Sequence, residues 1–295
     1  MRVTQSMLSN NMLRNLSNSY NKMGKLQEQI TTGKKVNRPS DDPVVVMKGM
    51  GYRMQVDKVM QYQRNLGEVT NWMDNTDDAL DKVGSALHRA NELVVSASTD
   101  TMTPEDREKL QSELEQLRMQ IQDIANTKVG DKYIFSGTKT SEPLFDSAGN
   151  YLPVDSANPT PPGYAADIEI EVFNGVSLTV NAKGYELFKN IDDLFEDITT
   201  NPTREDFDAA IGEIQTQMDG ILTIRADIGA RQNRAEMTGD RLSSMELSSK
   251  KLMSENEDID YEKVITDMIT EESIHRAALS VGARIIQPSL VDFLR

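Results

Sequence analysis

The 295-residue sequence contains no cysteine, two histidines and one tryptophan. The absence of cysteine excludes disulfides, thiolate metal ligands and a cysteine nucleophile. Aromatic residues make up 5% of the chain and hydrophobic residues 38%, both low for a compact fold of this length. We therefore expect long, solvent-exposed helices instead of one large globular core.

Long apolar runs are also missing. After Arg2 there is no apolar stretch of the length that a cleavable secretory signal needs. The longest early run covers residues 44–47, far short of a membrane span. We expect no insertion into a membrane, and a protein of this kind that leaves the cell needs a dedicated export machine.

Positive charge is scarce and unevenly placed. The formal net charge is −15, yet residues 1–50 carry eight Lys or Arg against three acids, a net of +5, which leaves −20 on the other 245 residues. No basic patch with interleaved aromatic residues is present, so we expect no nucleic-acid partner.

The most regular pattern runs through residues 52–97, where apolar residues recur at alternating steps of three and four. No proline occurs between Pro43 and Pro104. A 3.5-residue period of this length predicts one long helix packed lengthwise in a coiled coil. At about 1.5 Å per residue it would span roughly 80 Å. The repeating positions are Tyr52, Gln55, Val59, Tyr62, Leu66, Val69, Met73, Thr76, Leu80, Val83, Leu87, Ala90, Val94 and Ala97.

Residues 1–30 are polar but carry a weaker apolar seam. Full burial of about eight apolar side chains would contribute roughly 12–24 kcal/mol, whereas ordering thirty residues costs roughly 30–60 kcal/mol of backbone entropy. We therefore expect this terminal helix to be disordered in the free monomer and to fold against partners. The candidate assembly residues here are Leu13, Leu16, Tyr20, Met23 and Ile30.

The connection that follows contains clear signals for the end of one helix and the start of the next. Gly33 is expected to end the first helix, and Ser40, Asp41 or Asp42 to cap the next one, with Pro43 in its first turn. A metal site at Asp41 and Asp42 is the alternative, and capping is the commoner role. Gly33 and Lys34 lack the further residues of a phosphate-binding loop.

The remaining chain predicts further helices around one β-rich insertion. A helix should start at Pro104, a β-hairpin should turn at Asn174-Gly175, and helices should resume over residues 191–198 and from about residue 203. An acidic break over residues 254–260 precedes a last helix that Pro288 stops. Its candidate assembly residues are Val264, Met268, Ile274, Ala278, Val281 and Ile285.

The predicted fold is therefore mainly α: an elongated antiparallel helical bundle with a small inserted β-rich domain, and with terminal helices disordered in the monomer. We expect five segments. These are an assembly helix with its linker (1–42), a long helical hairpin (43–129), the β-rich domain (130–189), returning helices (190–254) and a C-terminal assembly helix (255–295).

No catalytic constellation emerges. His88 and His275 lack a matching nucleophile or ligand spacing, so we interpret both as helix-surface or packing residues. The acid pairs Asp77-Asp78 and Asp192-Asp193 are adjacent, so on helices their side chains point apart. We expect no enzyme, no cofactor and no metal. The β-rich domain is either a ligand-binding module or, more often for such insertions, a structural module displayed on the surface.

Several motifs resemble one family. Residues 29–37 (QITTGKKVN) and 40–43 (SDDP) are similar to the N-terminal signature of the flagellin superfamily, and residues 225–234 (RADIGARQNR) and 254–260 (SENEDID) to its C-terminal counterpart. Residues 132–137 (KYIFSG), 289–294 (SLVDFL) and Pro43 after the Asp pair are similar to its hook–filament junction proteins. The motif residues are Gly33, Ser40, Asp41, Asp42, Pro43, Arg225, Gly229, Arg231 and Asn233.

The resemblance implies a structural adaptor of the bacterial flagellum that self-associates in a ring or tube. The implied partners are the other hook-associated junction protein, flagellin, an export chaperone and the flagellar type III export apparatus, with the protein reaching the outside of the cell without a cleaved signal. The alternatives are the major filament subunit and a cytosolic signalling coiled coil with stably folded ends.

Overall fold

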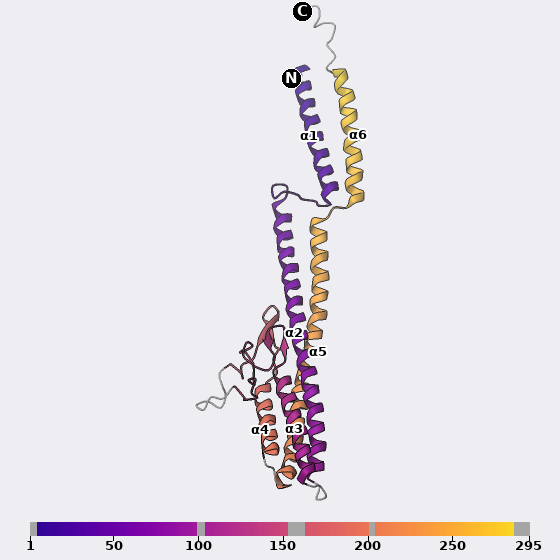
Figure 1. Cartoon of the computed structure of the whole chain (residues 1–295). Helices are drawn as coiled ribbons and strands as arrows, with labels where there is room; N and C mark the ends of the chain where they lie inside the picture. The colour runs from indigo at the N-terminus through magenta and orange to yellow at the C-terminus, as the bar shows by residue number, and fades with distance from the viewer. Residues whose placement is uncertain (1–4, 99–103, 153–162, 201–203, 286–295) are drawn as a thin grey trace, which may run out of the picture. The chain divides into compact units, whose positions relative to one another are not determined.

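The computed structural model describes residues 5–98, 104–152, 163–200 and 204–285, and its architecture is mainly helical (Figure 1). The predicted mainly α fold with a small β-rich insertion is confirmed. The helices are α1 (Gln5–Thr32), α2 (Pro43–Ala97), α3 (Pro104–Ala125), α4 (Gly184–Thr199), α5 (Arg204–Glu257) and α6 (Tyr261–Ile285). The strands are β1 (Lys128–Val129), β2 (Lys132–Tyr133), β3 (Glu169–Phe173) and β4 (Val176–Thr179).

The chain forms two compact units. Unit 1 consists of Met1–Lys58 and Met245–Arg295, and unit 2 is Val59–Ser244. Helices α2 and α5 therefore each contribute residues to both units. The predicted division into five segments is finer than this and stays a prediction.

Helix α2 is the predicted long helix, 55 residues from Pro43 to Ala97. From Val69 onward every position of the predicted seam is buried. The polar exception Thr76 is buried as well, and its hydroxyl donates to the Trp72 carbonyl at 2.8 Å, which satisfies it within its own helix. The 3.5-residue period thus marks the face that packs into unit 2.

Unit 2 holds the hydrophobic core, which α2, α3, α4 and α5 build together. Helix α5 runs antiparallel to α2, because Arg225 binds Asp77 at 2.8 Å and Gln232 binds Asp74 at 2.8 Å. Helix α3 is joined to α4 by Arg118, whose Nε lies 2.8 Å from Asp192. The inserted segment adds its own side chains to this core, among them Ile134, Phe135, Leu144, Val172, Leu178 and Val180.

The predicted β-hairpin is confirmed. Strands β3 and β4 pair antiparallel, with Ile170 opposite Leu178, and Gly175 takes a φ of 73° in the turn. Strands β1 and β2 form a second two-stranded ladder. The hairpin is fixed to α2 by Asn65, which donates to the Glu171 carbonyl at 2.7 Å.

Two element boundaries differ from the prediction. Helix α4 starts at Gly184 and not near residue 191, inside the segment expected to be β-rich, because Leu187 and Phe188 extend its buried face by two turns. Helix α5 continues to Glu257, so the predicted break at residues 254–260 is shorter; the Asp258 N–H still bonds to the Ser254 carbonyl at 2.8 Å.

The motif at residues 289–294 falls outside the described residues, as does Pro288, which was expected to stop the last helix. Within the described ranges, none of the helices combines the length and the apolar character that crossing a membrane requires.

Candidate assembly surface

Helices α1 and α6 pack side by side in unit 1 (Figure 1), and the predicted seam residues divide between the contact and the solvent. Half-buried seam residues are Leu16, Met23 and Ile30 on α1 and Val264, Met268 and Ala278 on α6. Leu13, Tyr20, Ile274 and Val281 are exposed. Ile285 is the last residue of α6, and its side chain lies outside the description.

Polar contacts and one glycine determine how closely α1 and α6 pack. The Ser19 hydroxyl donates to Glu271 at 3.2 Å, and Lys22 pairs with the same carboxylate at 3.3 Å. A Cβ atom added at Gly282 would lie 2.9 Å from the sulfur of Met12, so the two helices come close here. The contact is specific, but it leaves much of each helix open to solvent.

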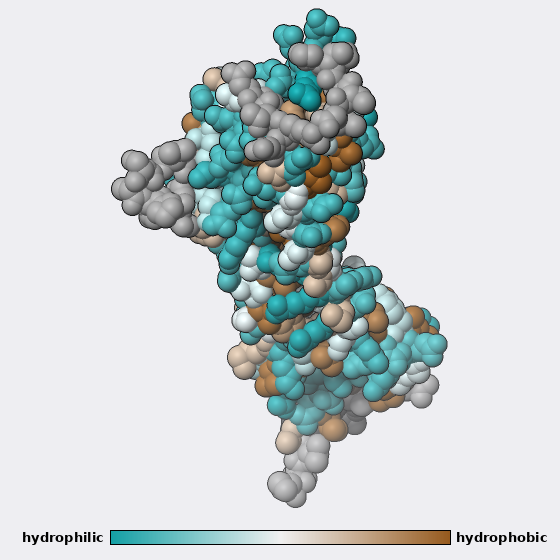
Figure 2. Space-filling model, turned by 90° about the horizontal axis from the view of Figure 1, so that it is seen from below, coloured by the Kyte–Doolittle hydropathy of each residue, from teal (hydrophilic) through white to brown (hydrophobic). Residues whose placement is uncertain are grey.

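Unit 1 has almost no hydrophobic core of its own. Among the described residues of unit 1, Val56 and Ile259 are the only hydrophobic side chains that are buried. Sixteen of the twenty-one large hydrophobic side chains found exposed in the described structure belong to unit 1. Figure 2 shows the molecule from below the view of Figure 1, and on that face apolar side chains lie among hydrophilic ones. Exposed apolar surface on this scale indicates an interaction site.

The linkers of unit 1 meet in a short antiparallel bridge, which we call the connector (residues 33–35 and 257–259). Gly33 ends α1 with a φ of 70°, as predicted. The Lys35 N–H donates to the Glu257 carbonyl at 2.7 Å, and the Ile259 N–H to the Gly33 carbonyl at 3.1 Å. The connector thus fixes the end of α1 beside the start of α6.

Charged side chains close the connector. Lys34 lies 2.6 Å from Asp258 and 3.4 Å from Glu257, and Arg53 of α2 lies 2.6 Å from Glu257. The hydrogen bond with Asp258 raises the pKa of Lys34, and the same bond lowers the pKa of Asp258. The sequence predicted an attraction between the basic first segment and the acids of residues 255–260 as a whole, but it did not single out Glu257, Asp258 or Arg53.

The N-terminal motif residues act on the start of α2. The Asp42 carboxylate accepts the Val44 and Val45 N–H groups at 2.9 and 3.1 Å, so Asp42 is the cap and Pro43 opens the helix. Asp41 instead pairs with Lys25 of α1 at 3.0 Å, which lowers the pKa of Asp41. Ser40 is exposed.

The C-terminal motif residues at positions 225–234 belong to unit 2. Arg225 bridges Asp77 and Asp81 of α2 at 2.8 and 2.7 Å. Arg231 donates to the carbonyls of Thr179 and Asn181 at 3.3 and 3.0 Å and so binds the exit of β4 to α5. Gly229 is half-buried and Asn233 is exposed. The structure therefore brings the motif at residues 254–260 to Gly33 in the connector, whereas residues 225–234 contact α2 and the exit of β4 within unit 2.

The histidines and paired acids take separate positions. His88 is exposed on α2, and His275 on α6 has its ring centroid 6.4 Å from that of Tyr20. Asp77 binds Arg225 while its neighbour Asp78 binds Lys82, as expected for adjacent helical residues. In the described part of the chain, no three His, Asp or Glu side chains are grouped as a metal site would need.

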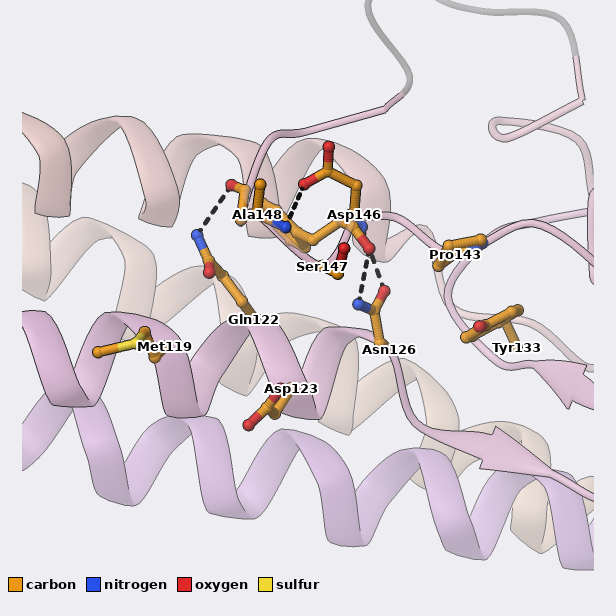
Figure 3. Close-up of a pocket in the computed structure, with 11 residues that line it drawn as sticks. Met119, Gln122, Asp123, Asn126, Tyr133, Pro143, Asp146, Ser147 and Ala148 are labelled. Atoms are coloured by element: carbon orange, nitrogen blue, oxygen red, sulfur yellow. Dashed lines mark hydrogen bonds between the residues drawn. The ribbon is translucent and has the colours of Figure 1, made fainter.

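A cavity of about 470 Å³ lies in unit 2 between the end of α3 and the loop over residues 143–149 (Figure 3). Its polar groups hold the loop itself. Asn126 bonds to the backbone of Leu144 and Phe145, Gln122 donates to the Gly149 carbonyl, and Asp146 accepts the Ala148 N–H. These contacts favour a structural role for the inserted segment, which stays a prediction.

Comparison with known proteins gives matches along most of the chain. The model of the bacterial flagellin N-terminal helical region matches residues 3–140, and that of the C-terminal helical region matches residues 211–294. The chain is 28% identical to flagellar hook-associated protein 3 of Salmonella typhimurium, over 94% of this chain and 95% of the relative. It is 27% identical to the Escherichia coli protein of that name, over 93% of each.

The fold has counterparts among solved structures. The crystal structure of Bacillus cereus FlgL superposes with a TM-score of 0.58 at 20% identity, covering 69% of this chain and 99% of the other. At this level of identity the likeness concerns the fold.

Proposed function

Because the chain belongs to the flagellin family, we propose that it is a structural adaptor that joins the flagellar hook to the flagellin filament. The two hook-associated relatives compared above, from Salmonella typhimurium and Escherichia coli, match over nearly the full length and are named for association with the hook. The chain would polymerise through its paired terminal helices, α1 and α6, between the other hook-associated junction protein and the first flagellins.

The observation that carries this proposal is the contrast between the two units. Unit 2 has a continuous hydrophobic core, whereas unit 1 presents its apolar side chains to solvent. Burial of a large apolar side chain contributes about 1.5–3 kcal/mol, so α1 and α6 gain stability chiefly when further surfaces cover them. An adaptor whose ends are completed by neighbouring copies has this distribution of apolar surface.

The state of the free protein follows from the same reasoning. The sequence-based estimate assumed full burial of the α1 seam, yet Leu13 and Tyr20 are exposed in the α1–α6 pair. Burial within the α1–α6 pair alone therefore offsets less of the backbone entropy cost of ordering α1 than the estimate assumed. Disorder of both terminal helices in the free monomer stays our prediction, and proton NMR of the purified chain would test it.

Export is a further part of the proposal. Terminal helices that are disordered in the free monomer, as predicted, would suit passage through the flagellar type III channel with a cytoplasmic chaperone, and delivery to the outside of the cell. These partners and this route come from the family resemblance. Their test is whether the full chain is found in the medium of a strain that has a working flagellar exporter and not in that of an exporter-deficient strain.

Electron microscopy of a deletion strain tests the adaptor role. We expect hooks without filaments and flagellin shed into the medium, with both defects corrected by the full-length gene. Filaments of normal length in the deletion strain would contradict the proposal.

The flagellin alternative predicts a different phenotype. Loss of the major filament subunit removes the filament without shedding flagellin, and the subunit is abundant, whereas a junction protein is scarce. The cytosolic coiled coil predicts stably folded ends and normal flagella after deletion. Immunoblots of cells, medium and isolated flagella from the same strain separate the three.

A further inference from the structure

A ridge of methionines is the most exposed apolar feature of α2 in unit 1. Met47, Met50 and Met54 are 69%, 60% and 63% exposed, and they lie on the face away from buried Gly49 and Val56. Methionine side chains adapt to irregular partners and are common on binding surfaces. Lys58 follows Met54 after one turn, is exposed, and makes no ion pair with the described residues.

Helix α6 carries a matching stripe of exposed apolar side chains, which begins at Tyr261, whose hydroxyl lies against Gly33. Tyr261, Ile265 and Ile269 are 51%, 44% and 59% exposed at steps of four residues. The next residue on this face is Glu272, whose side chain is 45% exposed and pairs with Arg276 of the same helix. The stripe is therefore three apolar residues followed by an acid.

The methionine ridge and the α6 stripe are complementary in spacing and in charge. Met47 and Lys58 are eleven residues apart, as are Tyr261 and Glu272. In a parallel alignment of the two helices, the three methionines lie opposite the three apolar residues of α6 in chain order, so that Met54 faces Ile269. Lys58 then lies opposite Glu272. In an antiparallel alignment Lys58 would lie near Tyr261 and the ionic match would be lost.

We propose that the methionine ridge of one copy binds the α6 stripe of a second copy in parallel orientation. The contact is heterologous, because different surfaces meet, and such contacts build rings or helical arrays. This inference rests on the proposed adaptor role and adds to it a defined contact between neighbouring copies, outside the α1–α6 pair.

Engineered disulfides test the contact, since the chain has no cysteine of its own. Two variants, Met54→Cys and Ile269→Cys, are expressed together with different tags in a strain that lacks the native gene. Isolated hook–filament particles are then oxidised. A disulfide needs Cα atoms about 4.4–6.8 Å apart, and we expect a disulfide-linked dimer that contains both tags.

The matched control is Met47→Cys with Ile269→Cys. In the parallel alignment these positions are offset by eight residues, or about 12 Å along the helix, so we expect at least fivefold less crosslinked dimer. A dimer formed equally well with Met47→Cys, or no dimer with Met54→Cys, would overturn the proposed contact.

Exchange of the two charges tests the proposed pairing of Lys58 with Glu272 independently. Lys58→Glu and Glu272→Lys should each lower the yield of the Met54→Cys–Ile269→Cys dimer severalfold, and the two changes together should restore it. Failure of restoration overturns the alignment. Immunoblots of the same particles report incorporation: particles that contain the chain without the crosslink contradict this contact alone, whereas absence of the chain from particles contradicts the adaptor role and the contact with it.

Discussion

Glu257 is the residue at which most contacts of the connector meet. Its carboxylate is held by Lys34 and Arg53, and its carbonyl accepts the Lys35 N–H. The side chain is only 10% exposed, and an unpaired buried carboxylate would cost several kcal/mol. The two cations are therefore necessary partners, and they tie the linker after α1, the start of α2 and the end of α5 to one another.

The connector should weaken in acid. Lys34 keeps the pKa of Asp258 below its ordinary value near 4, so Asp258 contributes stability above that value and loses it as pH falls through the lowered pKa. Lys34, with a raised pKa, contributes below its ordinary value of 10.5 and loses this only in strong alkali. We expect the Lys35 and Ile259 amides to keep their hydrogen-exchange protection above about pH 4 and to lose it as pH falls below that value, after correction for intrinsic rates.

The variant Asp258→Asn is the control for that experiment. It should lower protection at pH 7 and flatten the pH dependence, leaving the contribution of Asp41, whose pKa Lys25 lowers. An unchanged pH profile in the variant would show that Asp258 does not stabilise the connector.

At the scale of single residues, the sequence predicted contacts between neighbours in the chain but not contacts between residues far apart in the chain. Capping at the start of α2 depends on Asp42 and the next three residues, so spacing alone predicted a cap among Ser40, Asp41 and Asp42. Lys34 and Asp258 are 224 residues apart. Nothing in local periodicity relates two such positions, and only the folded chain shows that they meet.

Among the elements, α2 depends on the absence of a side chain at one position. A Cβ atom at Gly49 would collide with the Glu257 carboxylate, whose Cδ would lie 3.1 Å away. Gly51, two residues later in the same helix, has nothing within 4 Å of such an atom. The two glycines therefore form a matched pair in one helix.

We expect opposite effects from alanine at these positions. Gly51→Ala should stabilise unit 1 by about 0.5–1 kcal/mol through helix propensity. Gly49→Ala has the same gain but displaces Glu257 from Arg53 and Lys34, and hydrogen bonds to charged groups contribute about 1.5–3 kcal/mol. It should thus destabilise the connector by about 1–2 kcal/mol. Exchange protection at Lys35 and Ile259 measures both, and equal effects would refute the role of Glu257.

The helices were predictable because each has a continuous apolar period and clear end signals. Gly33, Pro43 and Pro104 marked ends that the structure places within one residue. The start of α4 was missed because Val176–Val180 precede it with a strand pattern and no cap separates the two; Lys183 makes no side-chain capping bond. Tertiary burial of Tyr185, Leu187 and Phe188 decides that helix start.

For the whole molecule, the two units respond differently to a charge on an exposed apolar position. Leu13 of α1 is 56% exposed in unit 1, and Leu222 of α5 is 59% exposed in unit 2. Surface changes usually alter folding stability by at most about 0.5 kcal/mol. Neither Leu13→Asp nor Leu222→Asp should therefore unfold unit 2, and the fluorescence of Trp72, buried in that core, reports this directly.

We expect Leu13→Asp, alone or with Leu16→Asp, to abolish filament attachment in a deletion strain, because the aspartate would be buried when α1 is covered by neighbouring copies. Leu222→Asp should support motility at more than half of the wild-type swarm diameter. Equal loss of motility in both variants would mean that assembly does not depend specifically on the terminal helices.

The sparse burial in unit 1 also bears on the mechanics of export. If the chain passes through a narrow channel as an extended thread, the work of unravelling falls almost wholly on unit 2, where the aromatic side chains Trp72, Phe135, Phe188 and Phe195 are packed. Either terminus could enter with little resistance. The exporter would meet its main energy barrier only after several dozen residues have been pulled in.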